Sequence, residues 1–297
     1  ATAYFAHSTN LLARTAAVLG KTEDARTYRT LFEGIRAAFQ REYLTPTGRM
    51  SSNTQTAYVL ALDFDLVPDS LRPRAAERLA ADVRQMGHLT TGFLGTPALT
   101  RTLSENGYLD EAYALLLNDQ YPSWLYEVKQ GATTVWERWD GQKPDSTFQE
   151  SSMNSFNHYA YGAVGDWMYR VVAGLNDDAS EPGYKHIVVR PRPGGGLAYA
   201  RATLVTPYGE AAAGWRLEGD RLVVTAIVPP NTRGTVRLPG ARLAQVREGG
   251  TGLAAASGVR RTTQSGDTVV VDVGSGRYTF TYDAAALAAT LRAPVKR

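Results

Sequence analysis

Residues 170–196, RVVAGLNDDASEPGYKHIVVRPRPGGG, separate two kinds of sequence pattern. Before this stretch the apolar residues recur at helical spacing, and after it they come in short runs closed by Gly and Pro. Residues 176–183 are polar and rich in turn-forming residues, so we predict a linker there. We therefore expect a helical domain over residues 1–175 and a β-type domain over residues 184–283.

The upstream part predicts about eight helices, and short connections imply that successive helices are antiparallel neighbours. The first is expected before Gly20, with Tyr4, Leu11, Leu12, Ala16 and Leu19 near helical spacing. The second is expected over residues 22–39, where a one-sided apolar stripe comprises Tyr28, Leu31, Phe32, Ile35 and Phe39. The others are predicted over 53–65, 70–87, 97–106, 108–119, 123–130 and 151–174.

The downstream part predicts an antiparallel β-sandwich, because short strands alternate with turns rich in Gly and Pro. Strands are expected over 186–190, 198–206, 211–218, 221–228, 234–238, 243–247, 268–273 and 277–282. The tail, residues 284–297, is rich in Ala and predicts a short helix or a frayed end.

The amino-acid composition excludes several classes of protein and of functional site. Of the 297 residues, 43% are hydrophobic and 21% are charged, which is typical of a globular protein and excludes wholesale disorder. Cysteine is absent, so disulfides, thiolate nucleophiles and Cys-based zinc sites are excluded. The net charge is only +3 and the basic residues are scattered, so we expect no nucleic-acid partner. We also expect no membrane span, since no long apolar run occurs, and no metal or other cofactor.

Residues 121–170 have the composition of a carbohydrate pocket. They contain four of the five Trp residues: Trp124, Trp136, Trp139 and Trp167. Within WERWD (136–140), two indoles need an apolar or sugar surface while three charged side chains need partners. An aromatic cleft for sugar satisfies both needs, because sugar rings have apolar faces that stack on indole and hydroxyls that bind charged groups.

Glu137 is the candidate general base in this stretch, with Arg138 beside it to keep the carboxylate ionised. The alternative is an ion pair between Glu137 and Arg138 at the start of a helix, next to two core indoles. His158, at the start of the helix predicted to run on to Val172, is a second candidate. Its alternative is a neutral histidine that forms hydrogen bonds inside the core.

Two motifs carry a resemblance to a known family. GATTVWERWDG (131–141) and SFNHYAYG (155–162) resemble the catalytic-domain motifs of bacterial α-L-rhamnosidases, glycoside hydrolase family 78. Three earlier motifs resemble that family in the same order: NTQTA (53–57), LTTGFLGTP (89–97) and YPSW (121–124). Five motifs in order make the resemblance specific, and it covers residues 1 to about 240.

The resemblance implies an (α/α)6 barrel followed by a C-terminal β-sandwich, and hydrolysis of terminal α-L-rhamnose with inversion. By motif, Glu137 would be the general base that activates water. Trp139 and His158 would line the rhamnose subsite, and Trp136 and Arg138 are further candidates for substrate binding. The expected substrate is a glycoside or polysaccharide that contains rhamnose.

The chain departs from the family pattern upstream of Glu137. The family's general acid lies in an acidic, Arg-rich motif that we do not find there, and about eight helices are too few for the twelve of the barrel. We therefore expect a fragment that holds the C-terminal two thirds of the barrel plus the sandwich. Such a fragment would be inactive alone, and its natural partner would be the remaining N-terminal part of the same protein.

Two other hypotheses about the function remain. A polysaccharide lyase on the same architecture could use Tyr159, Tyr161 or His158 as its base. A non-catalytic carbohydrate-binding fragment could use the sandwich, although its Trp215 lies in an alternating strand and is expected in the core.

Overall fold

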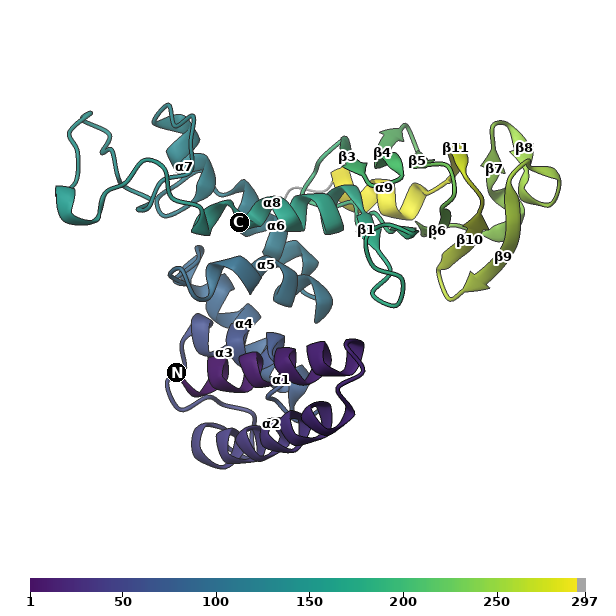
Figure 1. Ribbon diagram of the computed structural model, residues 1–297. Coiled ribbons are helices and arrows are strands. Elements are labelled where there is room, and N and C mark those ends of the chain that lie inside the picture. Colours follow the sequence, from purple (N-terminus) through teal and green to yellow (C-terminus); the bar gives the residue numbers. More distant parts are fainter. Residues whose placement is uncertain (293–297) are drawn as a thin grey trace. The chain divides into compact units, whose positions relative to one another are not determined.

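The computed structural model describes residues 1–292. The chain folds as two compact units, Ala1–Ala163 and a second unit that begins at Val164. Figure 1 shows helices throughout the first unit and strands through most of the second. The predicted order, a helical part followed by a β-sandwich, is therefore confirmed. Within residues 1–292, no helix combines the length and hydropathy that a membrane crossing needs.

Three helical hairpins and one short helix form the first unit (Figure 1). In each hairpin one helix packs against the next. The hairpins are α1 (Thr2–Val18) with α2 (Thr22–Tyr43), α3 (Gln55–Asp63) with α4 (Arg72–Met86), and α5 (Thr96–Glu105) with α6 (Leu109–Leu117). Helix α7 (Trp124–Lys129) follows. These seven helices match the predicted segments to within a few residues.

Local sequence sets where these helices begin and end. The hydroxyl of Thr54 accepts the N–H of Ala57 at 3.2 Å and caps α3. Ser123 caps α7 in the same way through the N–H of Tyr126, at 3.1 Å. Helix α4 ends at Gly87, whose φ of 70° lies in the left-handed region that favours glycine.

The first two helices bury different kinds of side chain. Helix α2 buries Phe32, Ile35 and Phe39, which confirms three of the five residues of its predicted stripe, while Leu31 is 42% exposed. Helix α1 buries small side chains: Ala6, Thr9, Ala13 and Ala16. Its large apolar side chains are exposed, and they are Tyr4, Phe5, Leu11, Leu12 and Val18; Leu19, directly after the helix, is exposed as well. Contiguous apolar surface of this kind favours association.

Self-association of the chain is therefore expected. Light scattering should give a mass above that of a monomer. The double variant Leu11→Glu/Leu12→Glu should return the mass toward that of a monomer, because two charges on the exposed apolar surface of α1 oppose the burial of that surface. The control variant Thr27→Glu/Thr30→Glu adds the same charge to an exposed part of α2 and should leave the association unchanged. A monomeric wild-type chain would contradict the prediction.

The long helix predicted over residues 151–174 is wrong. The structure has a 3-10 turn η1 (Ser151–Met153), an irregular segment, a second 3-10 turn η2 (Ala160–Ala163), one α-helical turn α8 (Val164–Trp167) and a π-helical turn η3 (Met168–Ala173). Backbone groups in the irregular segment bond to residues 135 and 137, far away in sequence. They are not available for the i to i−4 bonds of a helix.

Two sheets form the sandwich of the second unit (Figure 1). The first has the order β1 (Leu175–Asp177), β2 (His186–Val189), β6 (Arg233–Pro239), β10 (Thr268–Val273), β9 (Val259–Ser265). The second has the order β3 (Tyr199–Thr206), β4 (Gly209–Glu218), β5 (Arg221–Val228), β11 (Gly276–Asp283), β7 (Arg247–Glu248), β8 (Thr251–Gly252). Every paired neighbour is antiparallel except β2 and β6, which run parallel.

The sandwich core lies between the inward faces of the two sheets and contains residues such as Val224, Val271 and Phe280, each 0% exposed. Trp215 belongs to this core, as predicted. It is 3% exposed, and its indole N–H donates to the carbonyl of Val172 at 2.7 Å. Its ring therefore stabilises the sandwich and offers no platform for a sugar.

Several β elements differ from the prediction. The expected linker 176–183 begins inside β1, because Leu175 is 1% exposed in the core and anchors that strand beside β2. Most of the strand expected over 243–247 is a 3-10 turn, η4 (Leu243–Gln245). Strands β8 and β9 were not predicted; β9 is an edge strand whose residues, VRRTTQS, lack an apolar alternation. The tail forms helix α9 (Ala285–Arg292), and its residues 293–297 lie outside the described part.

Candidate active site

The two motifs that resemble the rhamnosidase family lie side by side in the first unit. The N–H of Glu137 donates to the carbonyl of Ser155 at 2.9 Å, and the N–H of His158 donates to the carbonyl of Val135 at 2.9 Å. The Thr134 hydroxyl also bonds the carbonyl of Phe156. Segment 131–141 is therefore paired with segment 155–158, which brings Glu137 and His158 onto one local framework.

Glu137 is half-buried and held by one defined hydrogen bond. Its Oε2 accepts the N–H of Ser155 at 2.8 Å. Arg138 does not pair with it: Nε of Arg138 lies 3.3 Å from Oδ1 of Asp140, and the other oxygen of Asp140 accepts from the Gln149 amide. The predicted contact of Arg138 with Glu137, whether in a site or as a core ion pair, is therefore wrong, because the guanidinium binds another carboxylate.

An aromatic cluster surrounds Tyr161. The ring of Trp139 stacks on that of Tyr161, with centroids 3.9 Å apart and planes at 11°. Trp124 meets Trp139 edge-on at 5.4 Å, and its indole N–H donates to the carbonyl of Tyr161 at 2.8 Å. Phe93 completes the cluster, at 5.3 Å from Tyr161. Trp139 is 8% exposed, so these contacts fix its ring firmly.

His158 lies between two other rings of this region. Phe93 stacks on it at 4.6 Å and Tyr159 at 5.4 Å, with planes at 22° and 7°. Nδ1 of His158 accepts the N–H of Ala160 at 3.3 Å. In the neutral imidazole the proton is then on Nε2, which leaves that nitrogen as a donor for a ligand hydroxyl.

Trp136 is packed more deeply than the other candidates. It is 4% exposed and meets Phe156 edge-on at 5.1 Å. Gly141 approaches its ring closely, since a Cβ at that position would lie 3.3 Å from the indole and 2.8 Å from the side-chain oxygen of Asn154. The contacts of Trp136 in this unit therefore support the segment that carries Glu137.

The earlier family motifs build the loop that carries Phe93. Gln55 is 0% exposed; its amide nitrogen donates to Asp82 at 2.8 Å and its oxygen accepts the N–H of Thr90 at 2.8 Å. At Gly95, a Cβ would lie 2.8 Å from the hydroxyl of Thr56, so only glycine allows this approach. Motif 53–57 thus holds motif 89–97, which the sequence suggested only as a resemblance.

Glu127 is a carboxyl group that the sequence reasoning missed. It is 4% exposed on α7, and burial raises its pKa to about 8, opposed only by the N–H of Trp136. No described residue bonds its Oε1. Burial also raises the pKa of Tyr161, and the Glu127 and Glu137 carboxyls act in the same direction. The available signal was a lone acidic residue in the otherwise largely apolar WLYEVK helix.

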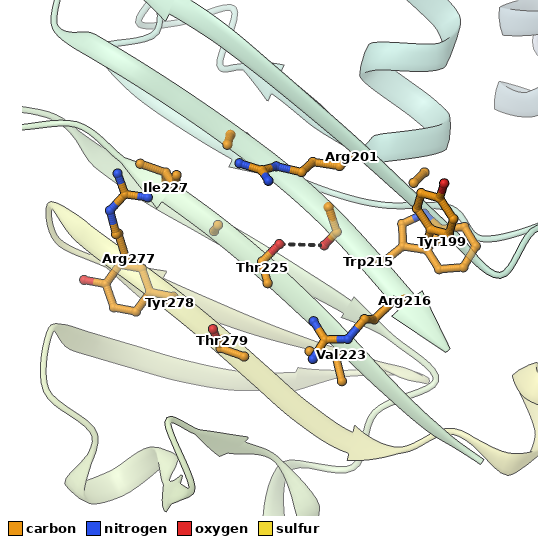
Figure 2. Close-up of a pocket in the computed structure, with 14 residues that line it drawn as sticks. Tyr199, Arg201, Trp215, Arg216, Val223, Thr225, Ile227, Arg277, Tyr278 and Thr279 are labelled. Atoms are coloured by element: carbon orange, nitrogen blue, oxygen red, sulfur yellow. Dashed lines mark hydrogen bonds between the residues drawn. The ribbon is translucent and has the colours of Figure 1, made fainter. Parts of the chain in front are cut away.

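Two hollows accompany these features, one in each unit. A shallow hollow of about 480 Å³ lies beside Tyr121, Tyr126, Asp140 and Lys143 in the first unit. A groove of about 410 Å³ crosses the outer face of β3, β4, β5 and β11, where Figure 2 shows Arg201, Arg216 and Arg277 around Thr225. The groove is lined by no carboxyl group and no histidine, so it offers no acid–base pair. Among residues 1–292, no group of His, Asp and Glu is placed to hold a metal ion.

Helical hairpins, a cluster of aromatic rings beside a carboxylate, and a following β-sandwich together define a hairpin-type glycosidase architecture. The family comparisons agree. Residues 1–172 match the bacterial alpha-L-rhamnosidase 6 hairpin glycosidase domain, and residues 174–252 match the bacterial alpha-L-rhamnosidase C-terminal domain. The chain belongs to the bacterial α-L-rhamnosidase family.

Individual relatives are similar over most of this chain. An alpha-L-rhamnosidase of Streptomyces avermitilis is 46% identical over 95% of the chain, and one of Formosa agariphila is 44% identical over 80%. The chain covers 26% of each relative, so it spans about a quarter of their length. The solved Streptomyces avermitilis α-L-rhamnosidase complexed with L-rhamnose matches with a TM-score of 0.87 at 45% identity, over 95% of this chain and 26% of that one. The Aspergillus terreus α-L-rhamnosidase matches at 0.82 and 38% identity, over 94% and 30%.

Proposed function

We propose that this chain supplies the general base and part of the rhamnose subsite of an α-L-rhamnosidase. The observation that carries the proposal is the convergence of motifs distant in sequence: Glu137 is paired with Ser155, and His158 stacks on Phe93. The family membership and the rhamnose complex of the Streptomyces avermitilis relative support it. A rhamnose-containing glycoside is the proposed substrate.

The proposed chemistry is inverting hydrolysis. Glu137 accepts a proton from a water molecule while the water oxygen attacks the anomeric carbon from the face opposite the leaving group. The glycosidic C–O bond breaks, and the leaving oxygen takes a proton from a general acid, which we do not assign to a residue of this chain. The bond from the Ser155 N–H fixes one oxygen of Glu137.

The aromatic cluster and His158 are proposed to bind the sugar. Apolar faces of the rhamnose ring and its methyl group pack against the rings near Trp139, while Nε2 of His158 donates to a sugar hydroxyl. Trp136 contributes by supporting the Glu137 segment, and Arg138 contributes through its fixed ion pair with Asp140. These roles fit a site that both buries apolar surface and orders hydroxyl groups.

Replacement of His158 by Ala is expected to raise KM and lower kcat together. The lost hydroxyl contact corresponds to roughly 1–3 kcal/mol of transition-state stabilisation. The assay uses a chimaera in which this chain replaces the matching quarter of the Streptomyces avermitilis relative. A variant that melts several degrees lower but keeps normal kinetics would show instead that His158 is a core histidine.

The proposed function is tested by the product that the chimaera forms. We expect free rhamnose from an aryl α-L-rhamnoside. An unsaturated, ultraviolet-absorbing product from a uronate polysaccharide would favour the hypothesis of a polysaccharide lyase. Saturable rhamnose binding without turnover would favour a non-catalytic binding fragment.

A further inference from the structure

Glu127 forms hydrogen bonds with both ends of residues 132–136, the segment that directly precedes the proposed base Glu137. Its backbone carbonyl accepts the N–H of Ala132 at 3.0 Å. Its Oε2 accepts the N–H of Trp136 at 3.5 Å, a long hydrogen bond beyond the usual range of about 2.7–3.2 Å. Trp136 directly precedes Glu137 in the chain. One residue of α7 therefore brackets residues 132–136, which lead into the base.

The opposite edge of the same segment is held by different residues. Val135 and Glu137 bond the backbone of His158 and Ser155, each at 2.9 Å, and the Glu137 carboxylate accepts the Ser155 N–H. The segment is thus fixed between α7 on one side and residues 155–158 on the other. A change at Glu127 acts on the N–H of Trp136, one peptide unit away from Glu137.

The surroundings of the Glu127 side chain favour its neutral form. The side chain is 4% exposed, Oε1 has no partner among the described residues, and no described cation contributes to its pKa, which burial raises to about 8. The titratable group that faces it is Tyr161, and Tyr161 is also influenced by Glu137 and Tyr121. All of these neighbours are acidic, so none stabilises a carboxylate at this position.

We propose that Glu127 is a positioning residue for Glu137: its neutral, buried carboxyl group holds the Trp136 N–H and thereby fixes the backbone that carries the base. The inference rests on the proposed role of Glu137. Ionisation of Glu127 requires hydration of a buried charge, which displaces the segment from α7. The geometry of Glu137 then changes at alkaline pH.

Two backbone amides of the intact chain report on this coupling without any substrate. Val135–Trp136 is the only Val-Trp pair in the sequence, and Asn154–Ser155 is the only Asn-Ser pair. Labelling the first residue type with carbonyl ¹³C and the second with ¹⁵N therefore leaves a single signal for each pair. The Trp136 signal reports on the bond to Glu127, and the Ser155 signal reports on the bond to Glu137.

Both signals are expected to shift together with a midpoint near pH 8 in the wild-type chain and to lose that step in Glu127→Gln. The control Glu150→Gln removes a charge from an exposed carboxylate and should keep the step. A step at Trp136 without one at Ser155 would overturn the proposal, because Glu127 would then not act on the base. A step that persists in Glu127→Gln would overturn it as well.

Kinetics of the chimaera give a second, separate readout. Glu127→Ala leaves the buried Trp136 N–H without its acceptor and should lower kcat/KM by roughly 5- to 150-fold. Glu127→Gln restores an acceptor and should recover most of that loss, with the alkaline limb of the pH profile displaced upward. Equal losses in both variants would contradict a positioning role. Failure of the proposed function would instead abolish wild-type turnover and leave the two amide signals as predicted.

Discussion

Glu137→Gln is expected to lower kcat at least ~10²-fold while rhamnose binding is largely retained, because an amide has the shape of the carboxylate but accepts no proton from water. Its oxygen can still accept the Ser155 N–H, so the local structure should persist. The loss should therefore appear in kcat with little change in KM.

The measurement is the steady-state kinetics of the chimaera on an aryl α-L-rhamnoside, together with rhamnose binding by tryptophan fluorescence. Glu150→Gln is the matched control, since it makes the same substitution at an exposed carboxylate of the same unit. A Glu137→Gln variant with near-normal kcat would remove Glu137 from the role of base. A variant that loses binding and turnover equally would indicate a structural role.

Glu127 is expected to make the stability of the first unit depend on pH. Its pKa is about 8 in the folded chain against an ordinary value of 4.5, so its stabilising contribution is fully present below 4.5 and is lost as the pH rises toward 8. That gap corresponds to about 5 kcal/mol in the free energy of unfolding. The Glu127→Gln variant has no titratable carboxyl group at this position, so its free energy of unfolding should not fall in this way as the pH rises.

The test compares wild type with Glu127→Gln by urea unfolding followed through the Val135–Trp136 amide signal. The difference between their unfolding free energies should grow in favour of Gln between pH 4.5 and pH 8. If the difference in unfolding free energy stayed constant over that range, ionisation of Glu127 would not destabilise the folded chain, and the prediction would be wrong.

Elements with a one-sided local pattern could be predicted from the sequence. Phe32, Ile35 and Phe39 recur at helical spacing and are buried together on α2. Alternating strands such as β11, which buries Tyr278, Phe280 and Tyr282, were found for the same reason. In α1 the apolar residues at helical spacing do not all pack inward: the small residues Ala13 and Ala16 are buried, while Leu12 is 45% exposed. Spacing identifies a helix, but here it did not identify which face packs.

Elements fixed by distant partners could not be predicted. Ser155 and His158 looked like part of a helix, and their backbones bond to residues 137 and 135 instead. Arg138 looked like a partner for Glu137 because the two are adjacent, and it binds Asp140. The pairing of residues 135 and 137 with 158 and 155 is not visible in a local window, since it depends on how separate segments meet in the folded unit. The ion pair of Arg138 with Asp140 is local, but adjacency in the sequence pointed to the wrong carboxylate.

The candidate site was predicted in part. The motifs suggested Glu137, Trp139 and His158, and the structure gives each of them defined contacts. Their functional roles remain proposals. Glu127 was missed because its local signal, a lone acidic residue in a largely apolar helix, does not reveal that the side chain is 4% exposed. Burial is a property of the folded unit, and the pKa of the group follows from it.

The central claim is that Glu137 activates the nucleophile in inverting cleavage of an α-L-rhamnoside, and azide rescue tests it most directly. In the Glu137→Ala chimaera, the space left by the carboxylate admits azide, which attacks the anomeric carbon without needing a base while the aryl oxygen leaves with the bonding electrons. The account predicts that azide restores turnover and that the product is the β-L-rhamnosyl azide. Azide that leaves the rate unchanged, or that yields the α-linked azide, would contradict it.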